Sequence, residues 1–245
     1  MVSYQWSVIS YGEELPVHNS RIFASLKVDQ NPESIKQQTT NSISLPGTTL
    51  PVMEHFYTIQ GEGFHQGKAA YFIRLGGCDV GCTWCDVKES WPLDTHPYYT
   101  IEALVTAVKK TNTKIVVVTG GEPLLHPLDD LTNALHAEGI HTNIETSGSS
   151  PLSGNWDWIC LSPKKFKRPL PEVLSKANEL KVIVYNKTDF AWGEQFATQV
   201  ATSCKLYLQP EWSKAAAMTP LIVDYIKQNP EWQLSLQIHK YINVP

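Results

Sequence analysis

Three cysteines stand close together in residues 76–86, which read Gly-Gly-Cys-Asp-Val-Gly-Cys-Thr-Trp-Cys-Asp. The thiols of Cys78, Cys82 and Cys85 are close enough in sequence to converge on one metal centre, and the neighbouring glycines let the loop wrap tightly. A structural zinc site needs four protein ligands, and neither neighbouring histidine stands at a finger-like spacing. Three ligands therefore favour a [4Fe–4S] cluster with one iron left open. A zinc site and three unliganded buried cysteines are the alternatives.

A second motif, Thr-Gly-Gly-Glu-Pro at residues 119–123, follows an apolar run. Glycines at the C-terminal end of a strand let backbone amides and carbonyls approach a ligand, and open α/β sheets bind ligands at that edge. Two later runs also end in small polar or charged residues, at Ser147 and at Ser-Pro-Lys 162–164. Loop capping alone would account for some of these residue types. With the cysteine loop, they indicate a ligand-binding rim.

A third motif, Gln-Gly-Glu-Gly at residues 60–63, precedes the run that carries Arg74. It supplies an amide, a carboxylate and flexible backbone amides. These groups suit the hydrogen-bonding edge of a purine-like or pterin ring. Alone the motif is a weak signal.

The elements between these motifs indicate the fold class. Short runs rich in β-branched or aromatic residues, bounded by Gly, Pro, Ser or Asn, are typical of buried parallel strands. They lie at 69–75, 115–119, 142–146, 158–162, 180–185 and 205–209. Between them we expect three helices. The first is capped by Thr100, the second begins at Pro127 and is closed by Gly139, and the third begins at Thr219-Pro220. About six βα units predict an α/β fold, a partial, open TIM-like barrel, since a full barrel has eight.

Composition limits the class of protein. The chain has 245 residues and a net charge of −4, which argues against broad nucleic-acid binding. No apolar run is long enough for a membrane span, and no secretory signal is evident at Met1–Trp6. The five cysteines, an odd number, fit a reducing compartment, so we expect a cytoplasmic protein. Cys160 and Cys204 are expected to be small buried residues.

The N-terminal part differs from the rest in composition. Residues 30–49 are polar and contain Asn-Pro and Pro-Gly pairs, which indicate a loop or linker. Strands are expected at 6–10 and 21–28. We therefore expect residues 1–50 to form an N-terminal extension without a chemical motif, and residues 51–245 to form the barrel domain.

The cysteine loop resembles a known superfamily. Cys-x3-Cys-x2-Cys with an aromatic residue, Trp84, before the last cysteine is the signature of radical S-adenosylmethionine (SAM) enzymes. The resemblance implies a full or partial βα barrel in which SAM chelates the open iron through its amino and carboxylate groups. It also implies that an electron from the cluster splits SAM into methionine and a 5′-deoxyadenosyl radical.

Within this superfamily, the motifs of residues 50–245 resemble the 7-carboxy-7-deazaguanine synthase family in order and spacing, including Gln-Ile-His-Lys-Tyr at 237–241. The resemblance implies a carbon–nitrogen lyase of the 7-deazapurine (queuosine precursor) pathway. The reaction would convert 6-carboxy-5,6,7,8-tetrahydropterin to 7-carboxy-7-deazaguanine with loss of ammonia. The implied partners are this small-molecule substrate, an electron donor such as flavodoxin and a second copy of the chain, with no nucleic acid or membrane.

The resemblance also assigns roles to individual residues. No side chain is expected to act as an acid or base, because the cofactor supplies the radical chemistry. The cluster ligands would be Cys78, Cys82 and Cys85. The residues at SAM would be Trp84, Asp86, Gly120, Gly121, Glu122, Ser147, Ser162, Pro163 and Lys164. The residues at the pterin would be Ile59, Gln60, Gly61, Arg74, Thr119 and Pro245, with Arg74 suited to the substrate carboxylate.

One position departs from the family pattern. Members commonly have Cys-Asp-Thr at the last cluster cysteine, where the threonine hydroxyl helps to hold Mg²⁺. This chain has Cys85-Asp86-Val87. Valine offers no oxygen and Mg²⁺ requires oxygen ligands, so we expect weak dependence on Mg²⁺.

Two other functions remain as alternatives. An activating enzyme for a glycyl-radical protein shares the cysteine loop but docks a protein, and the Gln-Gly-Glu-Gly motif argues against it. A non-catalytic zinc-binding interaction module is the other. About four iron atoms per chain would exclude the zinc module.

Overall fold

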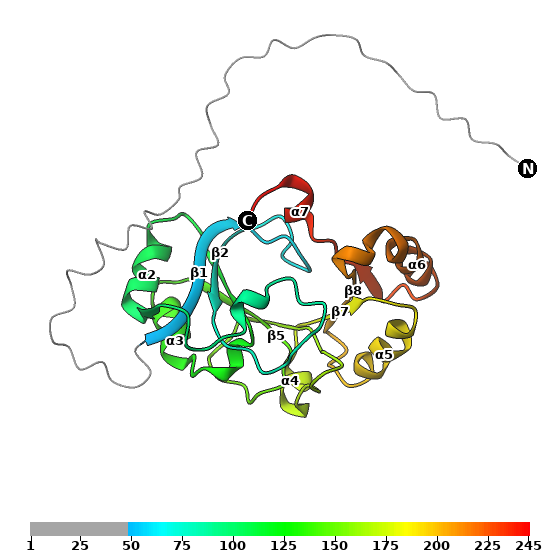
Figure 1. Cartoon of the computed structure of the whole chain (residues 1–245), viewed down its shortest axis with the longest axis horizontal. Coiled ribbons are helices and arrows are strands. Elements are labelled where there is room, and N and C mark those ends of the chain that lie inside the picture. Colours follow the sequence, from blue (N-terminus) through cyan, green and yellow to red (C-terminus); the bar gives the residue numbers. More distant parts are fainter. Residues whose placement is uncertain (1–48) are drawn as a thin grey trace, which may run out of the picture. The chain divides into compact units, whose positions relative to one another are not determined.

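A computed structural model describes residues 49–245, which form a single curved sheet of nine strands with helices around its outer side (Figure 1). The strand order is β3-β1-β2-β4-β5-β6-β7-β8-β9. β1 pairs antiparallel with β2 and β3, and every pairing from β2 to β9 is parallel. The two edge strands β3 and β9 do not meet, so the predicted α/β fold with an open, partial barrel is confirmed.

The strands are β1 Thr49–Ile59, β2 Ala69–Leu75, β3 Tyr98–Thr100, β4 Ile115–Gly120, β5 His141–Thr146, β6 Trp158–Leu161, β7 Glu179–Val184, β8 Lys205–Pro210 and β9 Trp232–Leu234. The α-helices are α2 Ile101–Lys109, α3 Asp129–Ala137, α4 Pro171–Lys176, α5 Thr188–Ala197, α6 Ala215–Gln228 and α7 Ile238–Ile242. Short 3-10 helices are η2 Lys88–Ser90, η3 Pro123–Leu125 and η4 Trp212–Lys214. Among the described residues, no helix is both long and apolar enough to cross a membrane.

The six predicted strands are confirmed as β2 and β4 to β8. Three strands were not predicted: β1, whose side chains are mostly half-buried, and the three-residue strands β3 and β9. Helix α2 begins as predicted, since the Thr100 hydroxyl accepts a hydrogen bond from the Ala103 amide at 3.1 Å. Residues 1–48 lie outside the described part, and with them the strands expected at 6–10 and 21–28.

Two predicted helix starts were wrong. Helix α3 begins at Asp129 instead of Pro127, because Leu128 has non-helical dihedral angles and its amide donates to the Ser153 hydroxyl at 2.8 Å. Helix α6 begins at Ala215, so Pro220 lies inside it. The 3-10 helix η4 runs directly into a stretch of alanines, which are strong helix formers and carry the helix through the proline.

The two faces of the sheet differ in polarity. Leu161, Leu180 and Val182 belong to the apolar core that packs beneath the outer helices. The alternate residues Glu179 and Lys181 point to the inside of the barrel, where they line cavities. Burying polar groups costs free energy unless they are paired, so a polar interior marks the inside of the barrel as the functional face. Cys160 and Cys204 are both buried, as predicted.

Candidate functional site

A pocket of about 380 Å³ lies inside the barrel and is lined by residues of strands and loops from Phe56 to Pro245. It brings together the residues that the sequence analysis singled out for cluster, SAM and pterin, with one exception. Pro163 does not line it, although its neighbours Ser162 and Lys164 do. The structure thus joins three motifs that are far apart in sequence, while the role of each residue toward a ligand stays a prediction.

The cysteine loop leaves the end of β2 and is held by backbone hydrogen bonds. The amide of Gly77 donates to the Ser90 carbonyl at 2.7 Å, and the amide of Cys78 donates to the Trp91 carbonyl at 3.1 Å. Burial raises the pKa of the Cys78 thiol and raises that of Cys82 to about 11. A metal bound here would therefore displace protons from the thiols, as metal ligation by cysteine requires.

The three thiols border one pocket without converging on a single point. In residues 49–245, no three His, Cys, Asp or Glu side chains are arranged to hold one metal ion. Cys78, Cys82 and Cys85 nevertheless all line the pocket. Three thiolates at one pocket are the donor set of a [4Fe–4S] cluster with one open iron, whereas a structural zinc site needs four protein ligands. The donor set is therefore compatible with a [4Fe–4S] cluster.

The glycine turn after β4 packs directly on the cysteine loop. A Cβ atom on Gly121 would lie 2.2 Å from the Gly77 carbonyl oxygen and 2.7 Å from Cys78 Cβ. Gly120 has a φ of +146°, and a Cβ there would lie 2.3 Å from the Leu75 carbonyl oxygen. A side chain at either position would push the two loops apart, so both glycines are required by close approach.

Glu122 ties the ends of two strands together. Its buried carboxylate accepts hydrogen bonds from the amides of Leu124 at 3.1 Å and Ser147 at 2.9 Å, and from the hydroxyls of Thr146 and Ser147. These contacts occupy both oxygens. The side chain thus positions the rim between β4 and β5, and the backbone of the glycine turn is the part of this motif that remains for a ligand.

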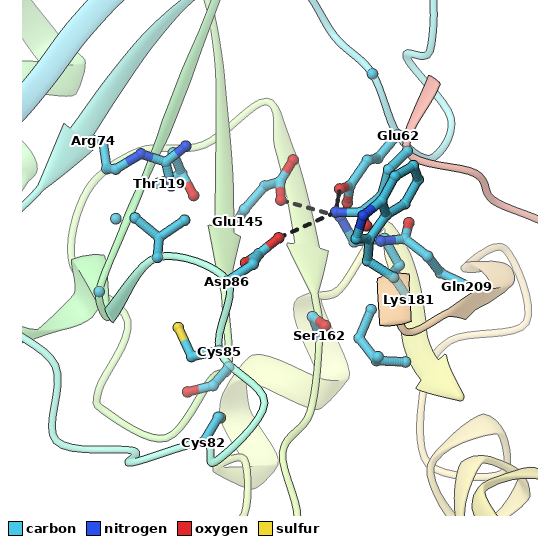
Figure 2. A pocket seen from close by; sticks show the side chains of 18 of the residues that line it. Glu62, Arg74, Cys82, Cys85, Asp86, Thr119, Glu145, Ser162, Lys181 and Gln209 are labelled. Atoms are coloured by element: carbon cyan, nitrogen blue, oxygen red, sulfur yellow. Dashed lines mark hydrogen bonds and ion pairs between the residues drawn. The ribbon is translucent and has the colours of Figure 1, made fainter. Parts of the chain in front are cut away.

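A buried ion-pair network forms one side of the pocket. The ammonium of Lys181 lies between the carboxylates of Glu62 and Glu145, 3.1 Å from the latter (Figure 2). Gln60 donates to Glu145 at 2.9 Å, and Gln237 donates to Glu62 at 2.8 Å. Burial acts to raise the pKa of Glu62, but Lys181 outweighs it and lowers that pKa to about 2. The neighbouring carboxylates in turn raise the pKa of Lys181, so Glu62 is ionised and Lys181 is protonated at neutral pH.

Lys181 was not predicted as a site residue and was expected only as part of the strand at 180–185. The available signal was a charged residue within an otherwise apolar run, at a position that alternation places on the same face as Glu179 and Ile183.

The opposite side of the pocket carries Arg74 and Thr119 (Figure 2). The two residues are paired in register on the neighbouring strands β2 and β4. Arg74 Nε donates to Glu54 at 2.7 Å, and its side chain is largely buried. The terminal nitrogens of the guanidinium are not used in this bond, so they remain able to bind an anion.

The C-terminal segment closes part of the pocket. The amide of Ile238 donates to the Gly61 carbonyl at 3.0 Å, and Lys240 pairs with Asp86 at 2.8 Å. A Cβ on Gly61 would lie 2.1 Å from the His239 ring, so this glycine permits close packing of the segment. Pro245 also lines the pocket. Asp86, which follows the last cluster cysteine, is thus joined to residues near the C-terminal end of the chain.

Known proteins resemble this chain over most of its length. The Radical SAM superfamily model matches residues 72–181. The 7-carboxy-7-deazaguanine synthase of Flavobacterium psychrophilum is 56% identical over 199 residues, covering 81% of this chain and 94% of that protein. The enzyme of the same name from Synechocystis sp. is 47% identical over 196 residues, covering 80% of this chain and 94% of that protein.

A solved structure has the same fold. The crystal structure of QueE from Escherichia coli matches with a TM-score of 0.69 and 33% sequence identity, over 77% of this chain and 93% of that chain. Identity of 56% over 94% of an enzyme of this name argues against the zinc-module alternative. The chain belongs to the 7-carboxy-7-deazaguanine synthase family of the radical SAM superfamily.

Proposed function

We propose that this chain catalyses the conversion of 6-carboxy-5,6,7,8-tetrahydropterin to 7-carboxy-7-deazaguanine and ammonia. The observation that carries the proposal is one pocket with three kinds of groups. Cysteines and the glycine turn lie at one end, Arg74 lies on one side, and the Lys181 network lies on the other. Family membership supports the same activity.

The two sides of the pocket suit the two ends of the proposed substrate. The pterin carries a carboxylate at one end, and an arginine side chain can bind it through parallel N–H donors. At the other end its amino-pyrimidinone ring presents N–H donors, which Glu62 and Glu145 can accept. Gln60 adds a neutral hydrogen-bonding group on the Glu145 side, and Thr119 adds one on the Arg74 side. In this arrangement Lys181 fixes the two carboxylates and balances part of their charge.

The cluster end of the pocket suits SAM. When bound there, the cluster and SAM would supply the radical chemistry that starts the reaction of the pterin. The three cysteines would ligate the cluster, and the backbone of Gly120 and Gly121 would contact the methionine part. Lys164 donates to the Ser162 hydroxyl at 2.5 Å and lies 5.6 Å from the Trp84 ring centroid. These side chains form one connected group beside the cysteine loop, and we assign them to SAM binding.

An acidic protein is the electron donor that fits the surface beside the cluster. The basic loop 164–168 follows β6, and within it Lys167 pairs with Asp79 of the cysteine loop at 2.5 Å. Phe166 is 45% exposed and lies next to Trp84, with ring centroids 6.4 Å apart. An acidic donor such as flavodoxin would be attracted to this loop. The rate at which the donor reduces the cluster would then fall as salt screens the charges.

Two further proposals follow from the family. We propose a homodimer, which light scattering of the purified protein tests. We also place the enzyme in the cytoplasm, where thiols remain reduced and the three cysteines stay free to hold a cluster.

The decisive experiment is anaerobic turnover of the carboxypterin with SAM and a chemical reductant, followed by mass spectrometry. The expected product is lighter than the substrate by the mass of ammonia, and SAM is regenerated. Protein with about four iron atoms that cleaves SAM yet leaves the pterin intact would contradict the proposal. It would favour the glycyl-radical activating enzyme instead.

A further inference from the structure

The floor of the barrel holds a second, much smaller cavity. The loop 60–68 between β1 and β2 crosses the first residues of β6 and β7. The Phe64 ring stacks on Trp158 with centroids 4.6 Å apart, and the Phe64 amide donates to Glu179 at 3.2 Å. The enclosed cavity has a volume of about 10 Å³. Its lining includes His65, Asn143 and Glu179.

Three polar atoms around this cavity have no hydrogen-bond partner within the described part of the chain. They are His65 Nε2, Asn143 Oδ1 and Glu179 Oε1, and the three residues are 8%, 3% and 3% exposed. Leaving a buried polar atom unsatisfied costs about 1–3 kcal/mol. Three such atoms around one small cavity therefore point to a ligand that satisfies them together.

The hydrogen-bonding types of these atoms identify the ligand. His65 Nδ1 lies 3.1 Å from the Lys68 ammonium, which can only donate, so Nδ1 is the acceptor and Nε2 carries the hydrogen. Burial, with help from Lys68, lowers the pKa of His65 to about 4, so the ring is neutral at pH 7. The cavity therefore presents one donor, from His65, and two acceptors, from Asn143 and Glu179.

We propose that this cavity is a binding site for one ordered water molecule, which accepts from His65 Nε2 and donates to Asn143 Oδ1 and Glu179 Oε1. One water needs about 10–15 Å³ and forms about three hydrogen bonds when buried, so both the volume and the partners match. The water ties the loop 60–68 to β5 and β7. His65, Asn143 and Glu179 are its ligands.

The site positions residues of the larger pocket, and this part rests on the proposed function. Gln60, Glu62 and Glu145 line both cavities. Asn143 stands two residues before Glu145 on β5, and Glu179 stands two residues before Lys181 on β7, so each pair shares one face of its strand. Anchoring loop 60–68 to this lower layer holds Gln60 and Glu62 against the pterin. His65 and Asn143 are thus positioning residues.

A high-resolution crystal structure of the holoenzyme tests the water directly. We expect density for one water within hydrogen-bonding distance of the three atoms, about 2.7–3.2 Å. Absence of that density, or rotation of the three side chains to bond one another, overturns the proposal. This result does not depend on turnover, so it separates failure of the water site from failure of the proposed function.

Variants test the positioning role. Asn143→Leu removes an acceptor and fills the cavity, and we expect the KM for the pterin to rise about tenfold, with iron content and the KM for SAM unchanged. Thr142→Val is the matched control. Thr142 is buried on the same strand but donates to the Asn155 carbonyl on the other face, at 3.0 Å. It should lower Tm and leave the KM for the pterin within about twofold.

A second pair of variants, at His65, distinguishes loss of the hydrogen bond from misfolding. His65→Gln keeps an N–H donor of similar reach, whereas His65→Phe removes it. We expect a near-normal KM for the pterin in the first and a raised one in the second. Equal values in the two variants, or equal effects of Asn143→Leu and Thr142→Val on this KM, overturn the positioning role.

Discussion

The two ends of the main pocket are built in different ways. At the cluster end, loops approach one another through backbone, and the glycine turn lies against the cysteine loop with no room for a Cβ. At the Lys181 end, the contacts are between long charged side chains, and the partners of Lys181 come from the loop 60–68 and from β5. The first end depends on the absence of side chains, and the second depends on charge balance among largely buried side chains.

This difference determines how each end fails. A substitution in the cluster end removes a ligand or causes a steric clash, so its effect is local and chemical. A substitution in the Lys181 network leaves an unpaired buried charge, which costs stability as well as binding. The two ends therefore give separable readouts, iron content for one and unfolding free energy for the other.

The largest effect is expected at the cluster. Cys82→Ala should reduce turnover to background and abolish the visible iron–sulfur absorbance, because two thiolates do not replace three ligands. Iron analysis and absorbance of anaerobically purified protein measure this. Cys204 is buried and does not line the pocket, so the Cys204→Ala protein should retain the iron of the cluster. Retention of iron and turnover in Cys82→Ala would sink the assignment of the cluster.

The next effect is expected in the ion-pair network. Lys181→Met leaves Glu62 and Glu145, whose side chains are 14% and 22% exposed, without a cation, so we expect a loss of about 3 kcal/mol in the free energy of unfolding. Denaturant unfolding measures it. Lys109→Met breaks a solvent-exposed pair with Glu138 and should cost no more than about 1 kcal/mol. Equal losses in the two variants would show that the buried network contributes no more to the free energy of unfolding than the exposed pair does.

The same comparison explains what could be predicted from the sequence. The cluster end is encoded by residues adjacent in the chain, so the cysteine spacing and the glycine turn were recognisable before any fold was known. The partners of Lys181 are 119 and 36 positions away in the sequence. Only strand register brings them together. The start of α6 was wrongly predicted at Thr219-Pro220, because the preceding alanines carry the helix through the proline.

Acidification should lower the free energy of unfolding through two groups, Glu62 and His65. Glu62 has a pKa near 2 in the folded chain and an ordinary value of 4.5, so its contribution is complete above pH 4.5 and is lost as the pH falls towards 2. His65, with a folded pKa near 4, favours unfolding as the pH falls from 6.5 to 4. Unfolding free energies measured from pH 7 to 3 should show both windows. Glu62→Gln should reduce only the lower one, to which Asp86 and Asp157 with their lowered pKa values also contribute, and an unchanged profile would refute this.

A smaller effect is expected at the rim between β4 and β5. In Glu122→Gln the amide nitrogen cannot accept, so one oxygen's set of bonds to Leu124 and Thr146 or to Ser147 is lost. We expect a loss of about 1–3 kcal/mol in unfolding free energy and weaker SAM binding with iron content retained. Glu138→Gln on the surface is the control for the loss of charge. Calorimetry with SAM distinguishes this from a cluster defect, and unaltered SAM affinity would argue against a positioning role.

The smallest effect is expected for Mg²⁺. Asp86 and Val87 both line the pocket, but Asp86 is paired with Lys240 and valine has no oxygen to offer. An ion here would rely on substrate, water and a carboxylate already engaged, so turnover after chelation should rise on the order of only two- to threefold when Mg²⁺ is restored. Val87→Thr adds a hydroxyl at this position and should increase the dependence. A sharp Mg²⁺ requirement in the unaltered enzyme would mean that other oxygens of the pocket complete the ion's coordination, and Val87→Thr would then change nothing.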